Sequence, residues 1–248
     1  MRFFHQYVRR LLVSFLRRYP GLIRDALKPS PPHDHPSFGN LPDRPQRNFE
    51  DLDWMLVSNT TNKGLLVLEF DEAASLFRLA RSKPAAQIIE IGRYHGGSAF
   101  LFAVASDRDS VVTSIDIAPQ NDALLQIALT KSGLAHKVQL LVGDSPGVEA
   151  RPDFYDLIFV DGDHSYEGVF KDYQHWKKAV RLGGHLVFHN AAAGRLHTAT
   201  AAGPFRLAQE IEARDKAYFT RQPDVGSLAL FIRTQTPWLV SESQEESP

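Results

Sequence analysis

Cysteine is absent from this chain of 248 residues. Its absence excludes disulfide bonds, thiolate metal sites and a cysteine nucleophile. An excess of charge of either sign is also absent, because the formal net charge at pH 7 is -1. No overall electrostatic attraction therefore draws the protein to nucleic acid. We expect no nucleic-acid partner, and a reducing cytoplasm is the simplest compartment for a chain without cysteine.

The first 28 residues lack a long uncharged apolar run. Charged residues recur too often there for a transmembrane span, and the stretch has no h-region or small-residue cleavage site of a secretory signal. It does contain an apolar stripe at helical spacing with arginines beside it, which is typical of a helix that lies on an anionic membrane. Packing against the globular domain or a second subunit is the alternative. The stripe consists of Phe3, Phe4, Tyr7, Val8, Leu11, Leu12, Phe15, Leu16 and Tyr19.

Composition divides the chain into four parts. A basic amphipathic helix at residues 1–28 is followed by a linker rich in proline and histidine at 29–49. A globular domain is expected at 50–236, and an acidic, disordered tail at 237–248. The sequence leaves self-association into a homo-oligomer open.

A glycine-rich turn is the most informative feature that is present. An apolar run leads into Gly-x-x-x-Gly-Gly-Ser and then a second apolar stretch, which predicts a buried strand, a tight turn and the start of a helix. Glycine lets a ligand lie against bare backbone, and the first N–H groups of the helix are free to bind it. A turn without a ligand is the alternative. The candidate binding residues are Glu90, Gly92, Gly96, Gly97 and Ser98.

A second strand ends in an acid. The β-branched run 111–117 contains Asp116, about two dozen residues beyond the glycine turn. An acid at that distance in a βαβ unit can accept hydrogen bonds from the ribose hydroxyls of a nucleoside. The glycine spacing is not the Gly-x-Gly-x-x-Gly of dinucleotide enzymes, which disfavours a pyrophosphate ligand and a nicotinamide oxidoreductase. A nucleoside without phosphates fits the pattern better.

Further short apolar runs alternate with helical segments. This alternation predicts an α/β fold with a doubly wound, mostly parallel seven-stranded sheet, an antiparallel closing hairpin and an N-terminal helical extension. Ligands of such sheets bind at the carboxyl ends of the strands. The expected strands are 87–91, 111–117, 138–142, 155–160 and 185–188, with the hairpin at 218–220 and 227–232. The expected helices are 71–82, 97–106, 121–132, 167–181 and 204–214. The polar residues expected at strand ends are Glu90, Asp116, Asp144, Asp161 and Asn190.

In its motifs the chain resembles the class I S-adenosylmethionine-dependent methyltransferases. The shared motifs are Glu-Ile-Gly-x-x-x-Gly-x-Ser, Gly-Asp-Ser, Asp-Gly-Asp-His-Ser-Tyr-Glu and Gly-Gly-x-x-x-x-His, in this order within residues 64–233. The chain looks most like the branch that includes macrolide sugar O-methyltransferases and cephalosporin-hydroxylase or rhamnosyl O-methyltransferase-like proteins. The resemblance implies S-adenosylmethionine as cofactor and methyl transfer to a hydroxyl of a small acceptor, either a sugar or a phenolic natural product.

The resemblance also implies roles for the residues at the strand ends. Glu90 and the glycine turn would hold the methionine part of the cofactor, and Asp116 the ribose. Asp144 and Ser145 would lie at the adenine, although a turn-capping role for Asp144 stays open.

His164 is the expected general base, three residues beyond Asp161, the second expected catalytic residue. A histidine with a pKa of about 6.5 is suited to accept a proton near neutral pH. Related sugar O-methyltransferases have a histidine at this point of the motif. The alternative for His164 is a hydrogen bond to the backbone of its own loop.

A divalent cation is implied by the same resemblance. In the family, the first acid of Asp-Gly-Asp-His and a carboxylate after the last parallel strand help to bind a magnesium-like ion. Here Asp161 matches the first acid, but Asn190 replaces the second, and His189 falls where catechol-type enzymes have an aspartate. We expect these three residues to bind magnesium weakly, or to select manganese or a later transition metal. Loss of the metal site is the alternative.

The alternative function is binding without catalysis. Such a protein would keep the cofactor fold and would be recruited to a membrane or a complex by its N-terminal helix. The departure from the family at His189 and Asn190 is compatible with it.

Overall fold

The computed structural model describes residues 38–56, 65–193 and 201–235. The expected amphipathic helix at 1–28 and the expected tail at 237–248 lie outside these ranges. Among the helices of the described ranges, none is both long and apolar enough to cross a membrane.

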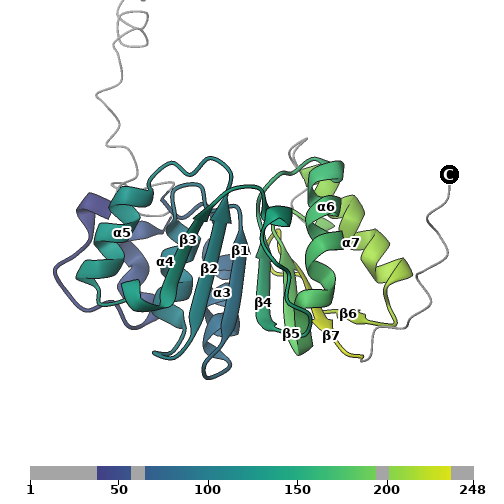
Figure 1. Cartoon of the computed structure of the whole chain (residues 1–248), viewed down its shortest axis with the longest axis horizontal. Helices are drawn as coiled ribbons and strands as arrows, with labels where there is room; N and C mark the ends of the chain where they lie inside the picture. The colour runs from purple at the N-terminus through teal and green to yellow at the C-terminus, as the bar shows by residue number, and fades with distance from the viewer. Residues whose placement is uncertain (1–37, 57–64, 194–200, 236–248) are drawn as a thin grey trace, which may run out of the picture. The chain divides into compact units, whose positions relative to one another are not determined.

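Seven strands of the described chain form one sheet in the order β3-β2-β1-β4-β5-β7-β6. The strands β1 to β5 pair in parallel, whereas β7 runs antiparallel to both β5 and β6. This arrangement confirms the expected doubly wound, mostly parallel α/β fold (Figure 1). The strands are β1 (Gln87–Ile91), β2 (Val111–Asp116), β3 (Val138–Val142), β4 (Tyr155–Val160), β5 (Val180–Phe188), β6 (Phe219–Arg221) and β7 (Ala229–Arg233).

Helices cover both faces of the sheet. Successive side chains of a strand point to opposite faces, so Ile88 of β1 packs into one hydrophobic cluster and Ile89 into another. Residues of α3, α4 and α5 belong to the first cluster, and residues of α6 and α7 to the second. The helices are α3 (Phe70–Arg81), α4 (Gly97–Ala105), α5 (Asp122–Lys131), α6 (Tyr166–Trp176) and α7 (Ala202–Arg214).

The sheet grows in both directions from β1. Its neighbours are β2 on one side and β4 on the other, and the helices that follow β1 and β4, α4 and α6, pack on opposite faces. The chain therefore continues from the ends of β1 and β4 to opposite faces of the sheet, which favours a crevice at the carboxyl ends of these strands. Ligands of doubly wound sheets bind at such a point.

One helix ends earlier than its sequence pattern predicts. The helix expected at 167–181 ends at Trp176, and β5 begins at Val180 instead of residue 185. Val180 pairs with Tyr155 of β4, beyond a register shift in the ladder. Pairing with a neighbouring strand thus overrides the local pattern, which on its own could not reveal that partner.

The described end of the expected linker packs against the domain. Phe38 is 4% exposed, and its ring centroid lies 5.4 Å from that of Phe100 on α4 and 6.0 Å from that of Trp54. The indole N–H of Trp54 in turn donates a hydrogen bond of 3.0 Å to Gln46 Oε1. We therefore propose that the domain begins at or before Phe38, and not at residue 50.

The substitution Phe38→Ala should lower the free energy of unfolding by about 3 kcal/mol, because it empties a site between two buried aromatic rings. Urea denaturation measures this change. The matched control is Leu182→Ala, at a side chain that is 49% exposed, and it should stay within about 0.5 kcal/mol of the wild type. If Phe38→Ala and the control were equally stable, residues 38–49 would belong to the linker and not to the domain.

Candidate active site

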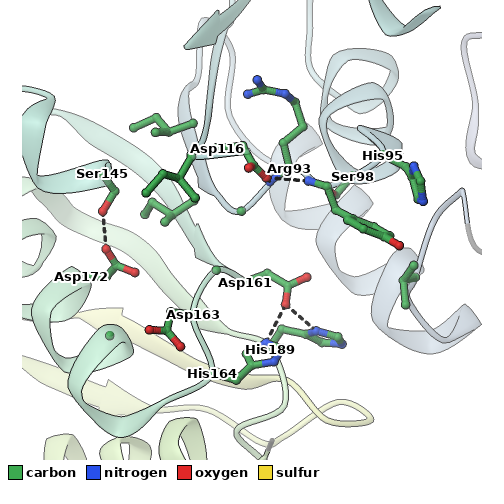
Figure 2. A pocket seen from close by; sticks show the side chains of 18 of the residues that line it. Arg93, His95, Ser98, Asp116, Ser145, Asp161, Asp163, His164, Asp172 and His189 are labelled. Carbon is green, nitrogen blue, oxygen red and sulfur yellow. Dashed lines mark hydrogen bonds and ion pairs between the residues drawn. The ribbon is translucent and has the colours of Figure 1, made fainter. Parts of the chain in front are cut away.

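A cavity of about 820 Å³ lies at the carboxyl ends of the parallel strands (Figure 2). The glycine turn after β1 lines it, together with the loops after β2, β3, β4 and β5. The predicted site residues in the lining are Gly92, Gly97, Ser98, Asp116, Asp144, Ser145, Asp161, His164, His189 and Asn190. The other two, Glu90 and Gly96, are buried and are not part of this lining.

Asp116 holds the glycine turn in shape. Its Oδ2 accepts hydrogen bonds from the backbone N–H groups of Arg93 at 2.7 Å and Tyr94 at 2.8 Å, and its Oδ1 accepts one from Ala118 at 2.7 Å. The end of β2 therefore fixes the turn after β1. Its contact with a ribose stays a prediction.

Arg93, within the glycine turn, is a structural residue that the sequence did not reveal. Its side chain is buried and makes a two-pronged ion pair with Asp122 of α5, at 2.8 and 2.7 Å. Its guanidinium also donates to the carbonyl of Leu141 on β3. Arg93 also donates to the carbonyl of Ser114 on β2 and thus ties the turn to three other elements. A charged residue between glycines is typically taken for an exposed loop residue.

Two of the glycines are needed for the packing of the protein itself, and their contact with a ligand stays a prediction. A Cβ on Gly92 would lie 2.1 Å from the carbonyl oxygen of Asp161, and a Cβ on Gly97 would lie 2.2 Å from that of Leu65. Protein segments, and not only a ligand, therefore approach the bare backbone. Gly96 has a left-handed backbone with φ +87° at the start of α4.

Glu90 lies behind the turn as a fully buried carboxylate. Burial raises its pKa to about 7, against the hydrogen bonds from the hydroxyls of Ser114 and Ser98, which lower it. Its Oε1 has no hydrogen-bond partner among the described residues. The carboxyl group therefore titrates near neutral pH in the cofactor-free protein.

Asp161, His164 and His189 form a cluster on the opposite side of the cavity (Figure 2). Both imidazoles approach the same oxygen, Asp161 Oδ1, with His164 Nε2 at 3.2 Å and His189 Nδ1 at 2.8 Å. Burial alone would raise the pKa of Asp161, but the two histidines hold it below its usual value. One ligand atom from each residue lies within 4.8 Å of the others, so the cluster could hold a metal ion. Asn190 lines the same cavity.

Glu72 extends this cluster and was not predicted as a site residue. This buried acid of α3 has its Oε2 3.7 Å from His189 Nε2, so His189 lies between two carboxylates. Burial would lower the pKa of His189, but Asp161 and Glu72 raise it to about 10. Burial would raise the pKa of Glu72, but His189 and the backbone N–H of Ser227 lower it to about 2. The only sequence signal at Glu72 was its place in the first turn of a helix.

Asp144 and Ser145 are paired with side chains of α6. Lys171 Nζ lies 2.6 Å from Asp144 Oδ2, and the hydroxyl of Ser145 donates to the carboxylate of Asp172. Burial raises the pKa of Asp172. Lys171 and Asp172 both line the cavity, but the sequence could not show which side of this helix faces it.

Exposed apolar side chains complete the lining. Ile117 is 73% exposed, Tyr94 55% and Val67 54%. Apolar side chains that stay exposed inside a cavity are typical of a binding site. Ile117 directly follows Asp116, so this apolar surface adjoins the end of β2.

Residues 89–191 match a family model described as a methyltransferase domain. This part of the chain is therefore similar to a methyltransferase domain. A protein of Mycobacterium sp. strain JLS with a provisional O-methyltransferase name is 31% identical over 124 residues, which cover 49% of this chain and 56% of that protein. Tricin synthase 1 of Oryza sativa subsp. japonica is 28% identical over 148 residues, or 56% of this chain and 58% of its own length. The chain thus spans little more than half the length of these relatives.

Solved methyltransferases share the fold. TomG from Streptomyces achromogenes, an O-methyltransferase involved in tomaymycin synthesis and solved in complex with S-adenosylmethionine, matches with a TM-score of 0.55 and 22% identity. The match covers 70% of this chain and 84% of TomG. A methyltransferase from Geobacter sulfurreducens matches with a TM-score of 0.56 and 23% identity, over 68% of this chain and 81% of that protein. The described domain of this chain therefore has the fold of these methyltransferases.

The substitution Glu90→Gln should remove part of the pH dependence of stability. The pKa of this carboxyl group is about 7 in the folded protein, against 4.5 for an unperturbed glutamate, so its contribution to stability is complete below pH 4.5. That stabilisation is lost as the pH rises to about 7. The wild type should therefore lose stability relative to Glu90→Gln across this window, in urea titrations of cofactor-free protein. Glu50→Gln, at an exposed position, is the matched control. Parallel stability curves for wild type and Glu90→Gln would contradict the raised pKa.

Proposed function

We propose that this protein is an S-adenosylmethionine-dependent O-methyltransferase that acts on a small hydroxylated acceptor. One observation carries the proposal: the glycine turn, Asp116 and the Asp161–His164–His189 cluster meet in a single cavity of a methyltransferase domain. The O-methyltransferase names of the mycobacterial relatives support transfer to oxygen. In addition, TomG has the same fold and was solved with S-adenosylmethionine bound.

The cavity suits the chemistry of the cofactor. S-adenosylmethionine supplies a methyl group on a sulfonium, which is a good leaving group and needs little activation. Asp116 lies where a ribose is expected in a βαβ unit, and the exposed Ile117 beside it offers an apolar surface for the base. The residues that would hold the cofactor are Glu90, Gly92, Gly96, Gly97, Ser98, Asp116, Asp144 and Ser145.

We assign proton removal from the acceptor to His164. If its Nε2–H donates to Asp161 Oδ1 at 3.2 Å, Nδ1 of the neutral ring is left unprotonated and can accept a proton. Asp161 then orients the ring and stabilises the imidazolium that forms, as in other histidine–carboxylate pairs. The His164 side chain is 27% exposed, so an acceptor can reach it from the cavity.

The charges of the cavity favour a neutral acceptor, such as a sugar or a phenol. The described lining of the cavity contains two permanently cationic side chains, and each has a carboxylate partner. Arg93 pairs with Asp122, and Lys171 pairs with Asp144. A phosphorylated or carboxylated acceptor would therefore meet no unpaired cation there, while several aspartates would repel it. The modest volume of the cavity, about 820 Å³ for cofactor and acceptor together, supports a small acceptor.

A metal-assisted reaction is the second candidate, and the donor set of the cluster favours it. Magnesium prefers six oxygen ligands, but the cluster offers one carboxylate, Asp161, and two imidazoles, His164 and His189. These donors do not fit magnesium well and instead suit zinc, iron or nickel. In this version His164 would be a ligand and not the base, and Asn190 would supply an amide oxygen.

The substitution His164→Ala should lower turnover about 10²–10⁴-fold, because it removes the group that accepts the proton. S-adenosylhomocysteine at a hundredfold excess over its Kd should stabilise wild type and variant alike, by roughly 2.7 kcal/mol, whereas NAD should not. Thermal shift measures the binding, and release of S-adenosylhomocysteine with a panel of phenols and sugars measures turnover. The matched control is His136→Ala, at an exposed position outside the cavity. No shift of the wild type with S-adenosylhomocysteine would refute the proposed function, and binding without turnover would favour the non-catalytic alternative.

Metal selectivity tests the second candidate. After treatment with EDTA, the protein should bind zinc or manganese more tightly than magnesium in titration calorimetry, because two of the three donors are imidazoles. His189→Asp should shift the preference toward magnesium by adding a second carboxylate. Turnover that resists EDTA, in protein that retains no metal on elemental analysis, would exclude metal assistance and leave His164 as the base.

A further inference from the structure

Glu72 lies outside the range that matches the methyltransferase model, yet its side chain reaches the cavity residues. It belongs to the first turn of α3, where its Oε2 accepts the backbone N–H of Glu69 at 2.8 Å and so caps the helix. The same carboxylate makes two further contacts far along the chain. Its Oε1 accepts the backbone N–H of Ser227 at 2.6 Å, and its Oε2 lies 3.7 Å from His189 Nε2.

The turn at Ser227 is built around this carboxylate. Gly226 has a left-handed backbone with φ +60°, and a Cβ on it would lie 2.5 Å from Glu72 Oε1. A side chain at position 226 would therefore displace the acid. The absence of a side chain there lets the turn before β7 close over Glu72.

Ser227 in turn holds the loop that follows β5. Its carbonyl oxygen accepts the backbone N–H groups of Ala191 at 2.8 Å and Ala192 at 3.0 Å. Its hydroxyl accepts the N–H of Asn190 at 3.3 Å. Asn190 has φ +54°, a conformation that costs energy for a residue with a side chain and needs support from its surroundings. Ser227 provides that support.

We propose that Glu72 is a positioning residue of the active site. It acts on the loop after β5 from two sides, through the His189 ring and through Ser227. Its ion pair with Nε2 directs Nδ1 of His189 at Asp161 Oδ1, the oxygen that also contacts His164. The inference rests on the proposed function, because it concerns the group that would support the base.

A purely structural role makes a different prediction. If Glu72 only capped α3, its loss would lower stability without altering the environment of His189. Asp51 allows this comparison, because it also caps a short helix, Phe49–Met55. Its Oδ2 accepts the N–H groups of Arg47 and Asn48 at 2.9 Å each, and Asp51 does not line the cavity.

The experiment compares Glu72→Gln with Asp51→Ala in the full chain labelled with ¹⁵N-histidine. Imidazole ¹⁵N–¹H spectra report the protonation and hydrogen bonding of each ring nitrogen, and His189→Phe assigns the His189 signals. We expect Glu72→Gln to shift the His189 signals and Asp51→Ala to leave them in place, although both lower Tm. Turnover of Glu72→Gln should fall about 10- to 100-fold, as for other residues that orient a functional histidine, with unchanged affinity for S-adenosylhomocysteine.

Ser227→Ala is the second variant and removes the hydroxyl, which contacts both Asn190 and Glu72. It keeps the cap on α3, so it remains informative if Glu72→Gln does not fold, and it should shift the His189 signals. The proposal would be overturned if the His189 signals of Glu72→Gln matched those of the wild type. If Glu72→Gln does not fold, the same result in Ser227→Ala would overturn it. Failure of the wild type to bind S-adenosylhomocysteine would refute the proposed function separately, because the spectra report the His189 environment without any cofactor.

Discussion

The loops after β1 and β4 touch at Gly92, and the geometry of the site depends on that contact. The N–H of Asp161 donates to the carbonyl of Ile91 at 2.8 Å, and a Cβ at position 92 would lie 2.1 Å from the Asp161 carbonyl oxygen. Any side chain there would push away the loop that carries Asp161 and His164. Glycine at this position therefore sets the spacing between the turn for the cofactor and the cluster proposed for the acceptor.

The buried charges of Glu72, His189 and Asp161 are stable only because negative and positive groups alternate. Glu72, His189 and Asp161 follow one another as acid, base and acid. A single buried charge in this place would be costly, and removal of one member would leave its neighbour uncompensated. The alternation also explains why α3, which precedes the matched methyltransferase range, is needed for the site: it supplies the outer carboxylate.

The strand ends could be predicted from the sequence because each buried strand is a short apolar run with its functional residue directly after it. Asp116 and Asp161 were found in this way, and a parallel sheet brings such residues to one edge. Glu72, Arg93 and Lys171 could not be found, because their roles depend on partners far along the chain. The same limit applied to the end of α6. This helix ends at Trp176, earlier than its sequence pattern predicts, because the chain then pairs with β4.

The environment divides the buried carboxylates into two kinds. Burial raises the pKa of Glu90 to about 7 and also raises that of Asp172, whereas histidine contacts lower those of Glu72, to about 2, and Asp161. Carboxyl groups whose pKa values are pushed apart typically have different tasks in an active site. Next to His164, a carboxylate that stays ionised is available as a hydrogen-bond acceptor for the imidazole. Behind the glycine turn, the carboxyl group of Glu90 is partly protonated near neutral pH, so a nearby charge can change its protonation. A cation close to Glu90 and loss of the Glu90 proton would favour each other, because each stabilises the state that the other needs.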